Sequence, residues 1–292
     1  MMGQRLIGII GGTGLGEAIG VQLKNVVQED MDTPFGKPSG SILVGEFGST
    51  RIAFLARHGP GHRYNPSTVP YAANIFALKK LGVTTLIASA AVGSLQNEIT
   101  PGHLVLVDQI IDKTFRRQNT FYDAMGAVHC EFAQPCCKRL REKLMLAAEQ
   151  IDAVTHADGT YVCMEGPQFS TRAESLMHRQ WGGDLIGMTA MPEAKLAREA
   201  QMCYALVALA SDYDCWREHD AAMDKQGLLS EIIGNLTKAT QNAVALIERT
   251  LESDSLLCDD DCDCRKALEL AVWTAPEAID PKTRLALAPL FE

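Results

Sequence analysis

The sequence predicts an α/β protein in which a mixed, largely parallel central sheet is flanked by helices. Short β-branched runs alternate with helical stretches along the chain, as they do where crossovers join parallel strands. Several runs end in glycine or other small residues, which is typical of strands that enter tight turns. Neither an internal repeat nor a linker divides the chain. We therefore expect one main domain at residues 1–252.

The predicted strands are short apolar runs bounded by turn residues. In chain order they are residues 5–10, 42–47, 51–56, 83–90, 104–111, 161–164, 184–188 and 203–211. The second and third of these runs form a hairpin around Gly48. The sheet is therefore expected to combine this hairpin with strands that follow helices.

The predicted helices have apolar residues at a helical period. They are residues 66–81, 135–151, 171–181, 192–200 and 227–251. The first has a proline near its first turn and Gly82 at its end, which are helix start and stop signals.

The composition changes near Ser253. Residues 254–264 are acidic and rich in cysteine, and residues 265–273 return to helical spacing. We expect residues 253–292 to form a C-terminal appendage, with a partly ordered tail and a lid over the site as open alternatives. Cys262 and Cys264 are expected to be idle surface thiols, because a Cys-x-Cys pair needs two further ligands to define a zinc site.

The composition also argues against several classes of protein. The 292 residues have a formal charge of −9 and no basic cluster, which argues against a nucleic-acid partner. No apolar stretch approaches the length of a membrane span, and the apolar N-terminus reads as a strand rather than a secretory signal. The nine cysteines are expected to be reduced. We therefore expect a cytoplasmic protein.

Three strand ends carry groups that suit an anion. A Gly-Gly-Thr-Gly turn at residues 11–14 offers backbone N–H groups and the Thr13 hydroxyl. Arg57 can pair with phosphate through two N–H groups, and His58 can donate a hydrogen bond to the same anion. The small residues 88–94 end a third strand. Each feature alone is better explained by a tight turn or a surface side chain, but together they predict one oxyanion site.

Three longer strings give a more specific signal. They read MEGPQFSTRAES at residues 164–175, GMTAMPE at residues 187–193 and ASDYDCW at residues 210–216. Their order and spacing resemble the trimeric purine nucleoside phosphorylase family, and within it the methylthioadenosine phosphorylase branch. The glycine turn and the Arg57-His58 pair fit the same family. The resemblance covers roughly residues 5–250 and implies a single-domain nucleoside-phosphorylase-like fold.

The resemblance implies phosphorolysis of 5'-methylthioadenosine to adenine and 5-methylthioribose 1-phosphate, a step of purine and methionine salvage. Inorganic phosphate is then a co-substrate, and neither a cofactor nor a metal is expected. The positions that match the phosphate-binding residues of the family are Thr13, Arg57, His58, Ala90, Ala91 and Thr189. A homotrimer is implied because His129 matches a residue that a neighbouring subunit supplies to the 5' end of the nucleoside.

The remaining matches concern the nucleoside. Phe169 matches the ring that stacks on the purine, and Met188 matches the residue against the ribose. Ser170, Asp212 and Asp214 match base-recognition positions. The related branch specific for 6-oxopurines has Glu in place of Ser170 and Asn in place of Asp212, so the pattern favours adenine.

The chemistry requires an acid at the purine and an anion under the sugar. Phosphate is itself the nucleophile, so the protein has to hold it below C1' of a ribosyl group with oxocarbenium character. We expect Asp212 to protonate N7, with Asp214 beside it keeping one of the two carboxyls neutral. The alternative is an acidic turn whose two aspartates cap a helix at residues 216–223.

Other activities stay open from the sequence. An apolar 5' pocket is expected from Met223, Leu228 and Leu229, but the polar residues 224–226 between them leave adenosine as a second substrate. A phosphorylase for inosine or guanosine, a hydrolase of the same bond and a dinucleotide-binding module are the further alternatives. Phosphate dependence separates the hydrolase, and the missing G-x-G-x-x-G pattern argues against the dinucleotide module.

Overall fold

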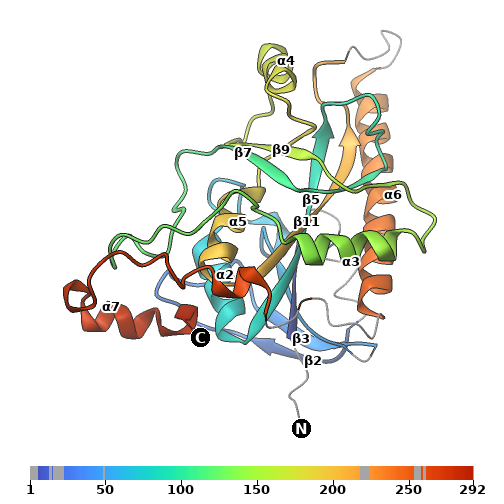
Figure 1. The fold of residues 1–292 in the computed structure, drawn as a ribbon. Helices are drawn as coiled ribbons and strands as arrows, with labels where there is room; N and C mark the ends of the chain where they lie inside the picture. The colour runs from blue at the N-terminus through green and yellow to red at the C-terminus, as the bar shows by residue number, and fades with distance from the viewer. Residues whose placement is uncertain are drawn as a thin grey trace.

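A computed structural model describes residues 6–12, 15, 23–48, 50–217, 224–252, 258 and 261–291 (Figure 1). These residues form one large sheet that helices cover on both faces, which confirms the predicted α/β class. Among them there is no helix of the length and apolarity needed to cross a lipid bilayer.

All eight predicted runs contain strands, and two further strands, at residues 24–29 and 155–156, were not predicted. The strands are β1 (Leu6–Gly11), β2 (Lys24–Glu29), β3 (Ile42–Phe47), β4 (Thr50–Ala56), β5 (Val83–Ser94), β6 (Leu104–Leu106), β7 (Gln109–Lys113), β8 (Thr155–His156), β9 (Thr160–Met164), β10 (Leu185–Gly187) and β11 (Cys203–Asp212). The main path of the sheet runs β2-β3-β4-β1-β5-β10-β9-β7. Off this path, β11 pairs with β5 and β6, and β6 also pairs with β8. The expected hairpin is the antiparallel pair β3 and β4.

Strand β5 is the centre of the sheet. It pairs in parallel with β11 from Thr85 to Gly93, and with β1 only as far as Ala88. On the β1 side its next partner is β10, which joins antiparallel at Gly93 and Ser94. Residues 89–92 of β5 therefore have no strand partner on that side within the described chain. This interruption opens the sheet at the ends of its central strands, where α/β proteins bind ligands.

The helices separate into two layers. Apolar residues of α2 (Tyr71–Lys80) and α5 (Ala190–Glu199) pack on one face of the sheet. Apolar residues of α3 (Lys138–Ala148) and α6 (Lys225–Leu251) pack on the other. Helix α4 (Arg172–Gln180) projects from one end of the sheet in Figure 1 and begins with a capping box between Thr171 and Glu174. The elements thus form a helix–sheet–helix sandwich.

Three predicted elements differ from the structure. The run at residues 104–111 is two strands, because β6 pairs with β11 and the chain then crosses to pair as β7 with β9. The first helix begins at Tyr71, five residues later than predicted, because residues 65–69 form hydrogen-bonded turns and Pro70 is the N-cap. The helical spacing of residues 265–273 is not a helix: Leu268 and Ala271 are buried on a turn-rich segment.

The described tail packs on the body of the protein. Its elements are η2 (Asp263–Lys266), η3 (Pro276–Ala278), α7 (Pro281–Ala286) and η4 (Ala288–Phe291). Leu287 and Leu290 join the core beneath α2. Cys262 and Cys264 are 4% and 5% exposed, so the prediction that they are surface thiols is wrong. Charged residues flank both cysteines in the sequence, but the fold packs the two side chains into the apolar cluster that contains residues of α3 and α6.

Candidate active site

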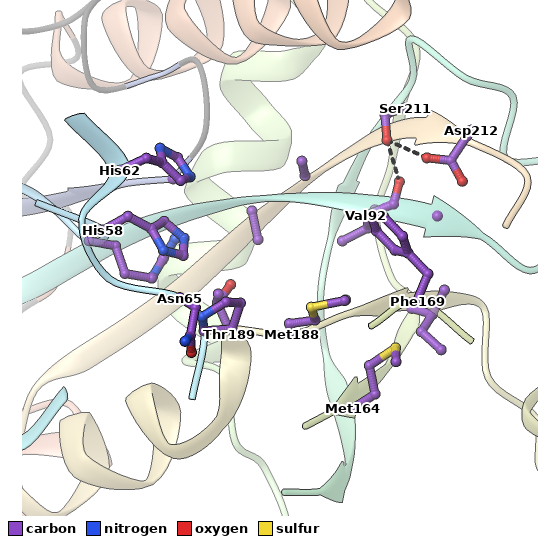
Figure 2. Close-up of a pocket in the computed structure, with 18 of the residues that line it drawn as sticks. His58, His62, Asn65, Val92, Met164, Phe169, Met188, Thr189, Ser211 and Asp212 are labelled. Carbon is purple, nitrogen blue, oxygen red and sulfur yellow. Dashed lines mark hydrogen bonds between the residues drawn. The ribbon is translucent and has the colours of Figure 1, made fainter. Parts of the chain in front are cut away.

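A cavity of about 550 Å³ opens where the sheet is interrupted beside β5 (Figure 2). Its volume falls in the range of small-molecule sites. One end is basic and contains Arg57, His58 and His62, and the other end contains Asp212 and Asp214. The remaining lining residues are Gly12, Arg63, Tyr64, Asn65, Pro66, Ala90, Ala91, Val92, Gly93, Met164, Phe169, Ile186, Gly187, Met188, Thr189, Ser211 and Ile232.

Most of the residues predicted for the site line this cavity. The exceptions are Thr13, Ser170, His129 and the residues expected at the 5' pocket, Met223, Leu228 and Leu229. Thr13 lies outside the described residues. Ser170 lies just behind the lining, where its Oγ donates to the Met164 sulfur at 3.6 Å. His129 is exposed, and its ring packs edge-on against that of Trp273, with 5.8 Å between the ring centroids. Neither residue lines the cavity.

The Arg57 guanidinium is fixed by two partners at the basic end. Its Nε and Nη2 donate to the Glu193 carboxylate at 2.7 and 2.9 Å, and its Nη1 donates to the Ser89 carbonyl at 2.7 Å. Both charged side chains are 1% exposed. Burial alone would lower the pKa of Arg57, but the charge and hydrogen bonds of Glu193 raise it. Arg57 is therefore a fixed cation.

Glu193 lies in one of the motifs found in the sequence, but no local pattern there indicates a role for it. The hydrogen bonds to Arg57 make it a positioning residue. Gly12 closes the same region: a Cβ there would lie 2.9 Å from Arg57 Nη1 and 2.8 Å from the Ser89 carbonyl. The glycine turn therefore has a packing reason that does not depend on any ligand.

His58 lies beside Arg57 as a neutral imidazole. Burial and the charge of Arg57 lower the pKa of His58 to about 4. Its Nδ1 is 2.8 Å from the Tyr64 carbonyl, which can only accept, so Nδ1 carries the proton. The Nε2 atom of neutral His58 is then an acceptor. Neutral His58 can therefore accept a hydrogen bond from phosphate through Nε2, which is the reverse of the predicted donation.

The acidic end is built at the end of β11. Asp212 Oδ1 accepts from the Asp214 N–H at 2.7 Å, in a turn where Asp214 has a φ of +50°. The segment is therefore not extended, and the two side chains approach through this turn. Burial, with a smaller effect from the charge of Asp212, raises the pKa of Asp214.

The Ser211 hydroxyl connects Asp212 to the central strand (Figure 2). Its Oγ lies 2.7 Å from Asp212 Oδ2 and 3.2 Å from the Val92 carbonyl. A hydroxyl has one hydrogen and the Val92 carbonyl has none. That hydrogen is therefore directed to the Asp212 carboxylate, the closer of the two acceptors, or shared with the Val92 carbonyl. Ser211 thus holds the Asp212 side chain next to the central strand.

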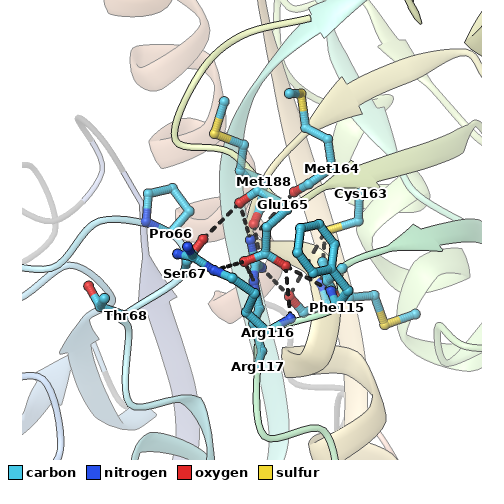
Figure 3. Close-up of polar contacts among 12 residues, drawn as sticks. Pro66, Ser67, Thr68, Phe115, Arg116, Arg117, Cys163, Met164, Glu165 and Met188 are labelled. Carbon is cyan, nitrogen blue, oxygen red and sulfur yellow. Dashed lines mark hydrogen bonds and ion pairs between the residues drawn. The ribbon is translucent and has the colours of Figure 1, made fainter.

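A second polar network holds the backbone of Met188, which lines the cavity (Figure 3). Arg117 Nη1 donates to the Met188 carbonyl at 2.6 Å, and Nη2 donates to the Glu165 carbonyl at 2.7 Å. Glu165 Oε2 accepts from the Phe115 N–H at 2.8 Å. Burial opposes the charged form, but hydrogen bonds from Ser67 and Phe115 and the charge of Arg117 lower the pKa of Glu165 to about 2.

Arg117 is a positioning residue that the sequence analysis missed. It reaches the loop before α5 from a segment far away in sequence, so no motif around it signals the contact. Phe169, by contrast, was predicted and lies 85% exposed on the loop after β9. Figure 2 shows it at the Asp212 end of the cavity, away from His58.

Comparison with known proteins gives the same assignment as the motifs. The sequence profile of the phosphorylase superfamily matches residues 6–252. S-methyl-5'-thioadenosine phosphorylase of Cereibacter sphaeroides is 46% identical over 277 residues, which cover 95% of this chain and 94% of that protein. The protein of the same name from Geobacter sulfurreducens is 45% identical over 286 residues, 96% of each chain.

Solved structures agree at the level of the fold. A methylthioadenosine phosphorylase from an antarctic soil metagenomic library matches with a TM-score of 0.87 at 41% identity, covering 99% of this chain and 100% of that one. The Schistosoma mansoni methylthioadenosine phosphorylase in complex with adenine matches with a TM-score of 0.78 at 36% identity, covering 85% and 90%. With these matches and the cavity at the central strand, the chain belongs to the phosphorylase superfamily, in its methylthioadenosine phosphorylase branch.

Proposed function

We propose that the protein catalyses the phosphorolysis of 5'-methylthioadenosine, forming adenine and 5-methylthioribose 1-phosphate. The main support is the distribution of charge in the cavity. The fixed cation Arg57 lies at one end, and the acidic pair Asp212 and Asp214 lies at the other. Relatives that are named for this activity match nearly the whole chain. A phosphate at the basic end and a purine at the acidic end would leave the ribose between them, beside Met188.

Phosphate would be held mainly by Arg57. Three of its five N–H groups are given to Glu193 and Ser89 within the described chain, which leaves two for an anion. His58 Nε2 would accept from the hydroxyl of a monoprotonated phosphate. The Thr13 and Thr189 hydroxyls and the backbone of Ala90 and Ala91 complete the proposed set. No protein base is needed, because phosphate is the nucleophile.

The purine would be held by the acidic end and the apolar wall. Asp214 Oδ2 is buried without a hydrogen-bond partner among the described residues, so it can accept from the 6-amino group of adenine. Asp212 would pass its proton to N7 as the bond to C1' breaks. Phe169 would stack on the ring, and Ser170 would line the base without demanding an N1 proton.

The residues predicted to surround the 5' group of the nucleoside lie on α6 or just before it in the sequence. Met223 lies outside the described residues, and Leu229 is 57% exposed on α6. Ile232, one turn further along α6, lines the cavity and was not predicted. Adenosine therefore stays as a second proposed substrate.

Release of free base from methylthioadenosine, adenosine and inosine, with and without phosphate, tests the proposal. We expect adenine release that needs phosphate, and inosine cleavage slower by about 10³-fold or more. Adenine release that continues without phosphate would favour a hydrolase, and preferred hypoxanthine release would favour a 6-oxopurine phosphorylase.

We also propose a cytoplasmic homotrimer in which His129 completes the site of a neighbouring subunit. The position of His129 outside its own cavity supports this arrangement. The nine cysteines form no disulfide among the described residues, which is typical of a reducing compartment.

A further inference from the structure

Four cysteines from three distant parts of the chain meet beneath the tail. Cys137 is the N-cap residue of α3, and Cys203 is the first residue of β11. Cys262 and Cys264 flank the start of η2. All four are at most 5% exposed, and their sulfur atoms all lie within 4.8 Å of one another. The fold thus supplies the two further ligands that the Cys-x-Cys pair lacks in the sequence.

The spacing of the sulfurs fits a metal better than a disulfide. Four thiolates at about 2.3 Å from a tetrahedral zinc ion stand about 3.8 Å from one another. The Cys137 and Cys262 sulfurs are 3.7 Å apart, whereas a disulfide joins its sulfurs at about 2 Å. None of the nine cysteines, all of which lie among the described residues, forms a disulfide. The Cys137 and Cys262 sulfurs therefore stand at the separation that a shared central ion requires, and every other pair in the set of four lies within 4.8 Å.

We propose that Cys137, Cys203, Cys262 and Cys264 bind a structural Zn²⁺ ion. Four thiolates form a closed, soft ligand set that favours zinc and leaves no position for a substrate or water. On binding, the four thiols release their protons to solvent and the metal keeps its oxidation state. None of the four lines the cavity, so the ion has no part in phosphorolysis.

The surroundings favour the negative charge that such a site carries. Cys137 stands at the N-terminus of α3, where the helix dipole is positive and backbone N–H groups lack helical partners. A fifth cysteine, Cys258, has its sulfur 3.7 Å from that of Cys137 but stands outside the set of four whose sulfurs are all mutually close. It lies next to the proposed site without completing it.

The proposed ion would fasten the tail to the body of the protein. Residues 271–274 follow the Cys-x-Cys pair and hold the loop at residues 126–129. His129 N–H donates to the Ala271 carbonyl at 2.9 Å, and Thr274 Oγ1 accepts from the Ala127 N–H at 2.7 Å. Val128 and Val272 form a β-bridge. The site therefore anchors the segment that positions His129.

Metal analysis of the full-length protein, purified with a reductant and without chelators, tests the proposal. We expect about one zinc per chain. Cobalt added to stripped, reduced protein should give the visible absorption of a tetrahedral thiolate site. Cys262→Ser and Cys264→Ser should lose the metal and lower Tm by more than about 5 °C. Cys136→Ser is the matched control, because Cys136 is also buried but packs in the other core cluster.

The outcomes are decisive even if a serine variant fails to fold, since the titration uses the wild-type chain. Wild-type protein that takes up neither zinc nor cobalt overturns the proposal. Disulfides among these four cysteines in protein prepared anaerobically also overturn it, as does equal metal loss from Cys136→Ser.

Discussion

Glu193 holds Arg57 in place at the proposed phosphate end of the cavity. The effect of this pair on phosphate binding can be measured separately from its effect on stability. Glu193→Gln leaves Arg57 buried without its counter-charge, so we expect a loss of about 3 kcal/mol in the free energy of unfolding. The KM for phosphate should rise by about tenfold or more, because the guanidinium is no longer aligned. Steady-state kinetics with phosphate varied measure this.

Glu199→Gln is the matched control for that variant. Glu199 is a carboxylate on the same helix that instead accepts from Thr120 and Phe121. It should lower stability without raising the phosphate KM. An equal rise in both variants would show that Glu193 acts only through the fold.

Asp212→Asn tests the proposed acid. The Asn amide keeps an oxygen that accepts from the Asp214 N–H, but it is too weak an acid to transfer a proton to N7. Turnover of methylthioadenosine should therefore fall about 10²- to 10⁴-fold. Tm should stay close to that of the wild type, as it should in the exposed control Asp123→Asn. Wild-type turnover would remove Asp212 from the chemistry.

His58 makes part of the stability depend on pH. Its pKa is about 4 in the fold and about 6.5 in an unfolded chain, so the folded state binds fewer protons between these values. Its contribution is complete above pH 6.5 and is lost as the pH falls towards 4. Urea unfolding between pH 4 and 8 should show a smaller loss on acidification in His58→Gln than in the wild type. The exposed His129→Gln should keep the wild-type slope.

At the scale of elements, β5 and the end of β11 are packed so closely that a methyl group matters. A Cβ at Gly93 would stand 3.1 Å from Asp212 Oδ1, Asp214 Cβ and Ile186 Cγ2. Gly93→Ala should therefore displace the acidic pair and lower kcat about tenfold or more. Gly234→Ala on α6 meets nothing within 4 Å and should instead raise stability by about 0.5–1 kcal/mol. Equal activity in both variants would contradict this account.

The sequence predicts elements well where one local pattern decides the structure. β5 and β11 are long apolar runs, and both were found. β2 was missed because it is a short, exposed edge strand with polar residues at both ends, and the structure pairs it with β3. The division of residues 104–111 was missed because a change of strand partner has no local signature.

At the scale of the whole molecule, the proposed trimer predicts that subunits can complement one another. His129→Ala disables the residue given to a neighbour, whereas Asp212→Asn disables a subunit's own site. Mixed trimers of the two variants should contain some intact sites, so co-refolded protein should be more active than either variant alone. Activity no greater than the mean of the two variants would argue against a shared site, as would a monomer by light scattering.

The site shows the same division between local and long-range information. Arg57, Thr189 and Asp212 lie in recognisable motifs, and the structure brings them to one cavity. Arg117 and the four-cysteine cluster depend on contacts between residues more than forty positions apart, which only the fold creates. Burial of Asp214 in a left-handed turn was equally invisible, because the motif resembles an extended strand end.

The edge of β5 that has no strand partner among the described residues makes the proposed anion site resistant to point mutation. Arg57 donates to the Ser89 carbonyl on that edge, and the alternation of a strand directs the Ala91 N–H to the same side. A side-chain replacement cannot delete a main-chain donor; proline alone among the coded residues removes it. The activity of variants at position 91 should therefore depend on the size of the new side chain and little on its polarity, which saturation mutagenesis can test.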